Sequence, residues 1–328
     1  VRFAPSHRRI ACMPTPQHPT PHPHLLTTLG LGIIALAAYR FWRWGEGGGL
    51  DVSGEDAVDK KQRLEALRKK WDVEQAALKR RLVTRDLIQW WLGDRVQEQE
   101  TEEKGGVQGR AKGRPLSLVG GVDISFLKDT DEALAALCIC EFPSMKVLYE
   151  DYKKVRMVNP YIAGYLAFRE VDSLVALYND LKINAPSLIP DVILVDGNGI
   201  LHPRGCGLAS HFGVLIGKET IGVGKKLHLV DGLTRDKVEA KFKAELKKPE
   251  HKNRKFAMTL TGDSGKVLGC AVRTTTTGSR PIYVSIGHGV SLETAKNIVL
   301  ACSVHRIPEQ VRQAELRSRD KIRQGIFD

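Results

Sequence analysis

The sequence predicts an α/β fold, in which helices flank a mixed β-sheet and a helical extension precedes it. Short apolar segments, such as 118–126 and 192–195, alternate with longer segments of helical periodicity, as in α/β domains. Three of the expected strands come before the first core helix, so neighbouring strands at the start of the sheet are joined directly. The 328 residues suffice for one catalytic domain of about 200 residues with appendages.

Each element is bounded by a change in hydrophobic pattern or by Gly and Pro. The expected strands are 118–126, 133–141, 147–154, 192–195, 220–224, 267–273 and 282–286. The expected helices of the core are 164–181, 207–217 and 292–302.

The chain divides into five parts by composition. Apolar residues recur at helical spacing between Asp56 and Leu92, for example Leu64, Leu67 and Trp71, which predicts a long helical region that docks on the core. A polar, Gly-rich stretch without periodicity follows and is expected to be a linker. The expected parts are an N-terminal extension 1–55, a helical lead-in 56–95, a linker 96–115, a core domain 116–305 and a basic C-terminal tail 306–328.

The N-terminal extension has an unusual composition. Residues 1–45 contain no Asp or Glu, and an apolar run begins at Leu25 and extends to Trp42. Its apolar core of fifteen residues, 25–39, is shorter than the stretch of about 20 that a membrane span needs. Membrane contact through 25–42 or organelle targeting by 1–45 is therefore one interpretation. An extension without either role is the other.

Charge and cysteine content narrow the function classes. The chain has 50 Lys and Arg against 38 Asp and Glu, a formal net charge of +12, which favours a polyanionic partner such as nucleic acid. The six cysteines lack a paired C-x-x-C spacing, so a zinc ribbon and a thioredoxin-type site are excluded. We expect reduced thiols in an intracellular protein.

Three carboxylates lie in or next to apolar segments. Asp123 is inside the strand SLVGGVDISF, Asp196 ends the strand DVILVDGNG, and Glu170 ends the segment GYLAFRE. A carboxylate in an apolar strand must be compensated by hydrogen bonds or a cation, and three such oxygens suit Mg²⁺ or Mn²⁺. Each residue also has an ordinary structural interpretation. Asp123 is then a turn or strand-edge residue, Asp196 caps a turn, and Glu170 pairs with Arg169 or lies on a solvated face.

Four further segments allow contact with a ligand. Glycines surround His202 and Arg204 and permit close backbone approach; two tight turns are the alternative. Tyr161 and Ile162 form an aromatic–aliphatic pair suited to entering a base stack, or a staple for the next helix. Lys225 and Lys226 end a strand, where they contact phosphate or remain solvated. His288 lies at a strand-to-helix turn, as a water-orienting or a structural residue.

Together these residues resemble a known family. The segments VGGVDISF, PYIAGYLAFRE, VDGNGILHPRGCGLASHFGVL, GVGKKL, GDSGKVLGCAVRT and YVSIGHGVSLETA look like the successive motifs of endonuclease V. They occur in the family's order and span about residues 118–305. The flanking segments WDVEQAALKRRLVTRD and RIPEQVRQAE resemble the animal branch of that family.

The resemblance implies an RNase H-like fold and a metal-dependent endonuclease. Such an enzyme recognises inosine in RNA or deoxyinosine in DNA and hydrolyses the second phosphodiester bond on the 3′ side, in RNA processing or in repair of deaminated adenine. It implies that Asp123, Glu170 and Asp196 bind Mg²⁺, with Mn²⁺ as a substitute. It also implies an active-site role for His288 and phosphate contact by Lys225.

The resemblance further implies residues that bind the base. The wedge motif falls on Pro160–Gly164, where Ala163 replaces a proline that is common in bacterial members. The implied substrate-binding residues are Tyr161, Ile162, Gly164, Leu166, Gly197, Gly199, His202 and Gly207.

The remaining expectations concern the setting of this activity. We expect a monomer that binds inosine-containing nucleic acid, single-stranded or structured RNA as well as deoxyinosine DNA, in the cytoplasm and the nucleus, including the nucleolus. The basic stretch 312–323 either touches the nucleic-acid backbone or forms a solvated amphipathic helix. The alternative interpretations of its function are an inosine-RNA-binding module that does not cleave, a membrane-anchored interaction protein, and a resolvase-like nuclease of the same fold.

Overall fold

The computed structural model describes residues 57–92 and 113–326. The extension 1–55, its apolar segment 25–42 and most of the linker 96–115 lie outside the described residues. Within the described part, no helix is long and apolar enough to cross a membrane.

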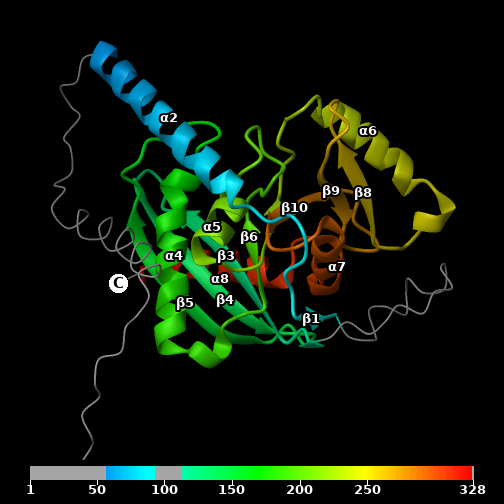
Figure 1. The fold of residues 1–328 in the computed structure, drawn as a ribbon. Helices are drawn as coiled ribbons and strands as arrows, with labels where there is room; N and C mark the ends of the chain where they lie inside the picture. Colours follow the sequence, from blue (N-terminus) through cyan, green and yellow to red (C-terminus); the bar gives the residue numbers. More distant parts are fainter. Residues whose placement is uncertain (1–56, 93–112, 327–328) are drawn as a thin grey trace, which may run out of the picture. The chain divides into compact units, whose positions relative to one another are not determined.

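A single mixed sheet of eight strands forms the centre of the molecule, with strand order β5-β4-β3-β6-β7-β10-β9-β8 (Figure 1). Strands β3, β6 and β7 are parallel, and the other neighbouring pairs are antiparallel. This confirms the predicted RNase H-like α/β class. The strands are β3 (Leu118–Phe126), β4 (Glu132–Glu141), β5 (Val147–Arg156), β6 (Val192–Asp196), β7 (Thr220–Gly224), β8 (Phe256–Thr261), β9 (Val267–Arg273) and β10 (Ile282–His288).

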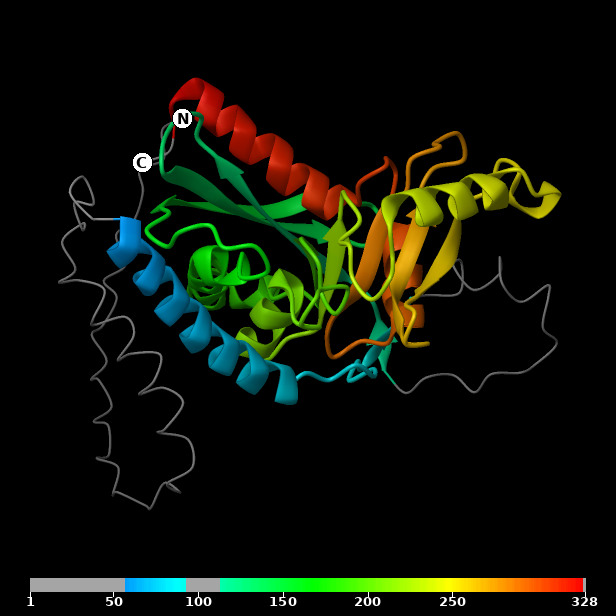
Figure 2. The ribbon, with the colours of Figure 1, turned by 90° about the horizontal axis from the view of Figure 1, so that it is seen from above.

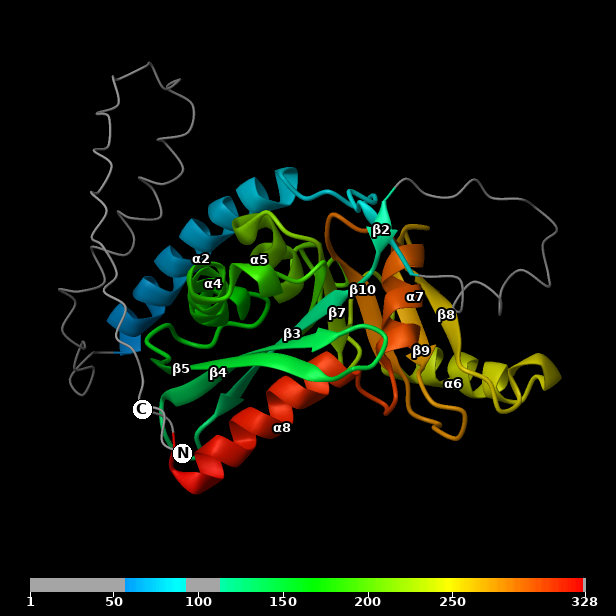
Figure 3. The same ribbon diagram turned by 90° about the horizontal axis from the view of Figure 1, so that it is seen from below.

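Helices cover both faces of this sheet. On one face lie α4 (Ala167–Asn184) and α5 (Leu208–Ile216), with α2 (Ala57–Arg80) outside them; on the other lie α7 (Leu292–Cys302) and α8 (Glu309–Gln324) (Figures 2 and 3). Strands β1 (Trp90–Trp91) and β2 (Arg114–Pro115) form a separate parallel pair. The remaining elements are α6 (Arg235–Leu246) and the 3-10 turns η1 (Pro186–Leu188) and η2 (Pro249–His251).

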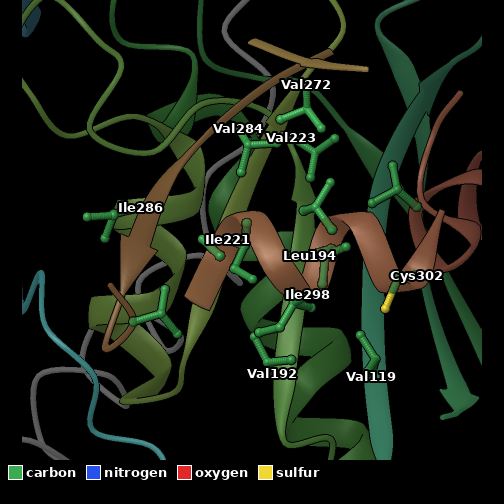
Figure 4. Packing of buried hydrophobic residues seen from close by; sticks show 14 of the residues in the cluster. Val119, Val192, Leu194, Ile221, Val223, Val272, Val284, Ile286, Ile298 and Cys302 are labelled. Atoms are coloured by element: carbon green, nitrogen blue, oxygen red, sulfur yellow. The ribbon is translucent and has the colours of Figure 1, made fainter. Parts of the chain in front are cut away.

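The sequence of β6 is apolar throughout because both of its faces are covered. Val192 and Leu194 point into a core that includes Ile298 of α7 (Figure 4). Ile193 and Val195 point the opposite way, into a core formed with α4 and α5. Asp196 is the last residue of β6, so it lies where the strand leaves the two hydrophobic cores.

The helical region expected over 56–92 is shorter in the structure. Helix α2 ends at Arg80, and the chain then runs along the turn after β10. Its peptide groups bond to that turn: the Gly289 amide donates to the Val83 carbonyl over 2.8 Å, and the Leu87 amide donates to the Gly289 carbonyl over 2.9 Å. These tertiary hydrogen bonds replace the helical ones.

Helix α6, strand β8 and the short strands β1 and β2 were not among the predicted elements, and the C-terminal segment differs from its prediction. Strand β8 alternates buried and partly or fully exposed residues, and α6 buries Val238 and Phe242. The segment 306–328, expected as a tail, contains α8, which packs along β3 and β4. Gly121 permits this contact, because a Cβ atom there would lie 2.3 Å from the carbonyl carbon of Gln310.

Candidate active site

A hollow of about 310 Å³ opens where β6 and β7 end. The three carboxylates that the sequence singled out line this hollow, together with residues of several helices and strands. The lining residues are Val122, Asp123, Ile124, Leu166, Glu170, Leu174, Val195, Asp196, Gly197, Asn198, Leu208, Gly224, Lys225 and Lys226.

Each carboxylate comes from a different element. Asp123 lies within β3, beside the register pair Val122–Val195 that joins β3 to β6. Asp196 is the last residue of β6, and Glu170 lies in the first turn of α4. Asp123 and Glu170 are each only 6% exposed. Sheet register and helix packing therefore bring together residues that are distant in the chain.

The electrostatics of the hollow favour a bound cation. Burial raises the pKa of Asp123, and a hydrogen bond to Asp196 and the charge of that neighbour raise it further. Burial also raises the pKa of Glu170 to about 7, with a smaller contribution from Asp196. The ionised carboxylates are thus poorly compensated by the described residues, and a cation among them would lower both pKa values.

Lys225 and Glu315 complete the charged cluster. The Lys225 ammonium donates to Asp196 Oδ2 over 2.6 Å and to Glu315 Oε2 over 2.7 Å. Burial alone would lower the pKa of Lys225, but these carboxylates raise it. Glu315 was missed because it lies on α8, in the assumed tail. A signal was available, since Glu315 ends the segment RIPEQVRQAE that resembles the animal branch.

The residues around the hollow have the donor chemistry of a magnesium site. They offer carboxylate oxygens and the Oδ1 atom of Asn198, which is buried and has no hydrogen-bond partner among the described residues. Such hard oxygen ligands suit Mg²⁺ and Mn²⁺. In the described part of the chain, no three acidic, His or Cys side chains already converge as a metal cluster, and the Lys225 ammonium supplies the positive charge instead.

The predicted wedge residues separate into exposed and buried positions. Tyr161 is 66% exposed, whereas Ile162 is 4% exposed and packs in a cluster with Trp71 of α2. Ile162 thus matches the staple interpretation, and Tyr161 is the side chain that projects. Gly164 has φ +82°, a conformation that favours glycine. Leu166 lines the hollow.

Helix α2 holds the loop that carries these residues. The Arg204 side chain donates to Gln75 Oε1 over 2.6 Å and to the Gly164 carbonyl over 3.0 Å. Its guanidinium also lies 3.8 Å from the centre of the Tyr165 ring. Gln75 Nε2 donates to the Cys206 carbonyl over 2.7 Å. The wedge loop is therefore fixed from a helix that precedes the sheet.

The remaining residues predicted to bind the base are Gly197, Gly199, His202 and Gly207, and only Gly197 is among the described residues that line the hollow. Gly197 lines it, whereas Gly199 and Gly207 pack against each other, with the Gly207 amide donating to the Gly199 carbonyl over 2.9 Å. His202 is buried, and burial first and His228 second lower its pKa to about 4. The interpretation as tight turns fits Gly199 and Gly207.

The structure does not place His288 with the carboxylates. His288 pairs with Thr220 at the beginning of β7, whereas Lys225 follows the end of that strand. At about 3.3 Å per residue, the two ends of β7 are roughly 13 Å apart. His288 Nδ1 instead accepts a hydrogen bond of 3.3 Å from the Val83 amide. The expected active-site role is corrected on this geometry to a structural one.

An RNase H-like sheet with an acidic hollow at its strand ends defines the class of the protein as a nucleic-acid hydrolase. The comparisons with known proteins narrow that class. A family model described as Endonuclease V matches residues 100–316. The chain belongs to the endonuclease V family.

Curated relatives agree with this assignment. Endonuclease V of Homo sapiens is 42% identical over 257 residues, which cover 78% of this chain and 83% of the human protein. Endonuclease V of Mus musculus is 44% identical over 257 residues, which cover 78% of this chain and 70% of the mouse protein.

Solved structures show the same fold. The catalytic domain of human Endonuclease V has a TM-score of 0.68 at 41% identity, covering 80% of this chain and 98% of that one. Ciona intestinalis Endonuclease V has a TM-score of 0.67 at 32% identity, covering 79% and 98%, and was solved in complex with a DNA that contains an inosine followed by a ribo-adenosine.

Proposed function

We propose that the protein is a divalent-metal-dependent endonuclease that recognises inosine in RNA or deoxyinosine in DNA and hydrolyses the second phosphodiester bond on its 3′ side. The observation that carries this proposal is the hollow that joins Asp123, Glu170 and Asp196 with Lys225. The inosine-containing DNA bound by the Ciona relative supports the choice of substrate.

The charged residues of the hollow have two roles, metal binding and contact with the phosphate. Asp123, Glu170 and Asp196 would hold Mg²⁺, or Mn²⁺ in its place. When bound, this ion activates water and stabilises the charge that develops on the phosphate. The Lys225 ammonium is oriented by Asp196 and Glu315, and from there it donates to a phosphate oxygen.

Base recognition would use the loop next to the hollow. Tyr161 is exposed and enters the base stack, which helps to turn the nucleotide out. Leu166 and Gly197 line the hollow, where backbone groups read the edge of hypoxanthine. Guanine, which carries an additional 2-amino group, is excluded by shape.

Cleavage of matched oligonucleotides tests the proposal. Single-stranded RNA and DNA, each with one inosine or with guanosine in its place, are incubated in Mg²⁺, in Mn²⁺ and in EDTA. Metal-dependent cutting one nucleotide beyond inosine is expected, and the RNA-to-DNA rate ratio identifies the preferred substrate. Asp123→Ala should abolish cleavage and retain binding. Inosine binding without cleavage by the wild type would favour the binding-module alternative.

We also propose that the enzyme acts as a monomer in the cytoplasm and the nucleus. Light scattering of the purified chain tests the first statement, and cell fractionation of the full-length protein tests the second. Recovery in the membrane fraction would instead favour the role of residues 25–42 in membrane contact.

A further inference from the structure

A second hollow lies outside the acidic site. It has a volume of about 610 Å³ and lies between the loop after β9 and the end of α7. None of the described residues that line it is acidic. Its polar lining consists mainly of Lys255, Thr275, Thr276, Thr277, His305 and Arg306. We call it the basic groove.

The cations of the basic groove are held by carbonyl oxygens. Lys255 Nζ donates to the carbonyls of Leu300 and Ser303 over 3.0 and 2.7 Å. The Arg306 guanidinium donates to the carbonyls of Pro281 and Lys225 over 2.8 and 3.2 Å. Within the described chain, no carboxylate forms an ion pair with either cation.

A third cation, Arg273, is also held by carbonyl oxygens, those of the loop that contributes the threonines of the groove. Arg273 is 9% exposed, and its guanidinium donates to the carbonyls of Gly278 and Thr276 over 2.8 and 2.5 Å. These bonds fix the threonine-rich loop that forms one wall. The Thr274 hydroxyl donates to the Arg306 carbonyl over 2.8 Å, which ties this wall to the opposite one. The groove is therefore built before any ligand arrives.

Among the described residues, the positive charge of this groove has no acidic partner. Carbonyl oxygens satisfy the donors of a cation but leave its net positive charge in place. Burial lowers the pKa of Lys255, and burial together with the neighbouring Arg280 lowers the pKa of Arg306. An anion placed among Lys255, Arg306 and the threonine hydroxyls would supply the missing negative charge.

The basic groove adjoins the acidic hollow through Arg306. Arg306 lines the groove, and its guanidinium contacts the main chain of Lys225, whose ammonium reaches Asp196 in the hollow. We propose that the basic groove binds backbone phosphates of the nucleic-acid strand that flanks the cleaved bond. This inference rests on the proposed function and adds a second, sequence-independent contact to it.

The chemistry of the groove predicts how it discriminates. Hydroxyls and cations contact phosphates without reading bases, so they add affinity for length and not for sequence. Each neutralised phosphate steepens the salt dependence of binding to single strands by about 0.7 in the log–log slope. The groove should therefore matter for extended substrates and leave short ones unaffected.

The test compares Thr276→Glu and Lys255→Met with the control Thr259→Glu. Thr259 is exposed on β8 and does not line the groove, so the control adds the same charge nearby. Substrates are an inosine oligonucleotide of about six nucleotides and versions extended by about twelve on the 5′ or the 3′ side. Anisotropy in EDTA measures binding, and cleavage in Mg²⁺ is followed separately.

For the extended substrates, we expect Thr276→Glu to weaken binding by about tenfold, with a shallower salt slope. Lys255→Met should act in the same direction, and the control should bind as the wild type does. All variants should bind and cleave the short substrate normally. Weaker binding of either the 5′-extended or the 3′-extended substrate by the groove variants supports the proposal. The substrate affected shows which side of the inosine lies in the groove.

Equal binding of both extended substrates by the wild type and the groove variants would overturn the proposal. A wild-type protein that fails to cut the short inosine substrate would instead contradict the proposed function. The two failures are distinguishable because the first is a ratio between variants and the second concerns the wild type alone.

Discussion

Gln75 and Arg204 are 129 residues apart in the chain and share a hydrogen bond of 2.6 Å. Gln75 belongs to α2, and Arg204 reaches from the turn after β6 to the carbonyl of Gly164. The bond links a helix outside the sheet to the loop that carries Tyr161. Helix α2 thus helps to hold the loop on which the resemblance places the wedge residues.

Gln75→Leu is expected to weaken substrate binding more than chemistry. The change leaves the Cys206 carbonyl and the Arg204 Nε–H without this partner, a cost of about 1–3 kcal/mol that loosens the wedge loop. We expect KM to rise by about tenfold while kcat stays within about threefold of the wild-type value. Steady-state cleavage kinetics measure both. Lys61→Ala, an exposed change on the same helix, is the control, and equal loss in kcat and kcat/KM would contradict the assignment.

Glu315→Gln should impair cleavage strongly. The Glu315 carboxylate and Asp196 both accept hydrogen bonds from the Lys225 ammonium. A neutral glutamine at position 315 removes one of these two charges and leaves the ammonium poorly oriented. We expect kcat/KM, measured by steady-state cleavage kinetics, to fall by about a hundredfold. Asp320→Asn, farther along α8 and paired only with neighbours on that helix, should retain full activity. Wild-type cleavage by Glu315→Gln would remove α8 from the site.

The metal-free protein should lose stability as the pH rises. The pKa of Glu170 is about 7 in the folded state against an ordinary 4.5, so between these values the folded state holds a proton that the unfolded state releases. The free energy of unfolding then falls with rising pH in that window, by about 3 kcal/mol from this residue. Urea unfolding in EDTA at about pH 5 and pH 8 measures the difference.

Glu170→Gln provides the control for this pH dependence. The glutamine carries no charge, so the variant should lose less stability than the wild type between the two pH values. Added Mn²⁺ should restore wild-type stability at high pH and act less on the variant. Identical pH profiles for the two proteins would show that the pKa of Glu170 is not raised in the folded state.

His288→Ala separates the two roles considered for this residue. Its Nδ1 atom accepts the Val83 amide, and burial lowers the pKa of His288, which keeps the ring a neutral acceptor. Replacement should cost about 1 kcal/mol of stability, seen as a lower melting temperature. Cleavage should stay within about threefold of the wild-type rate. A hundredfold loss in a fully folded variant would return His288 to the catalytic machinery.

Most of the fold could be predicted from the sequence, because hydrophobic patterns within short segments indicate its helices and strands. The apolar segment VILVD identified β6, and the position of Asp123 inside an apolar strand marked a carboxylate that needs compensation. The resemblance implied an active-site role for His288, but the register of β10 on β7 places this residue at the end of β7 that is distant from Lys225. Glu315 was missed for the complementary reason. On a charged helix, burial depends on docking, which the pattern of α8 alone does not reveal.

The docking of α8 also completes the charged cluster at the acidic hollow. Ser125 of β3 and Ser318 of α8 meet at 2.8 Å although 193 residues separate them. A nascent or truncated chain without α8 lacks Glu315 and leaves Lys225 without one of its two carboxylates. The elements before α8 therefore supply only part of the charged cluster around Lys225.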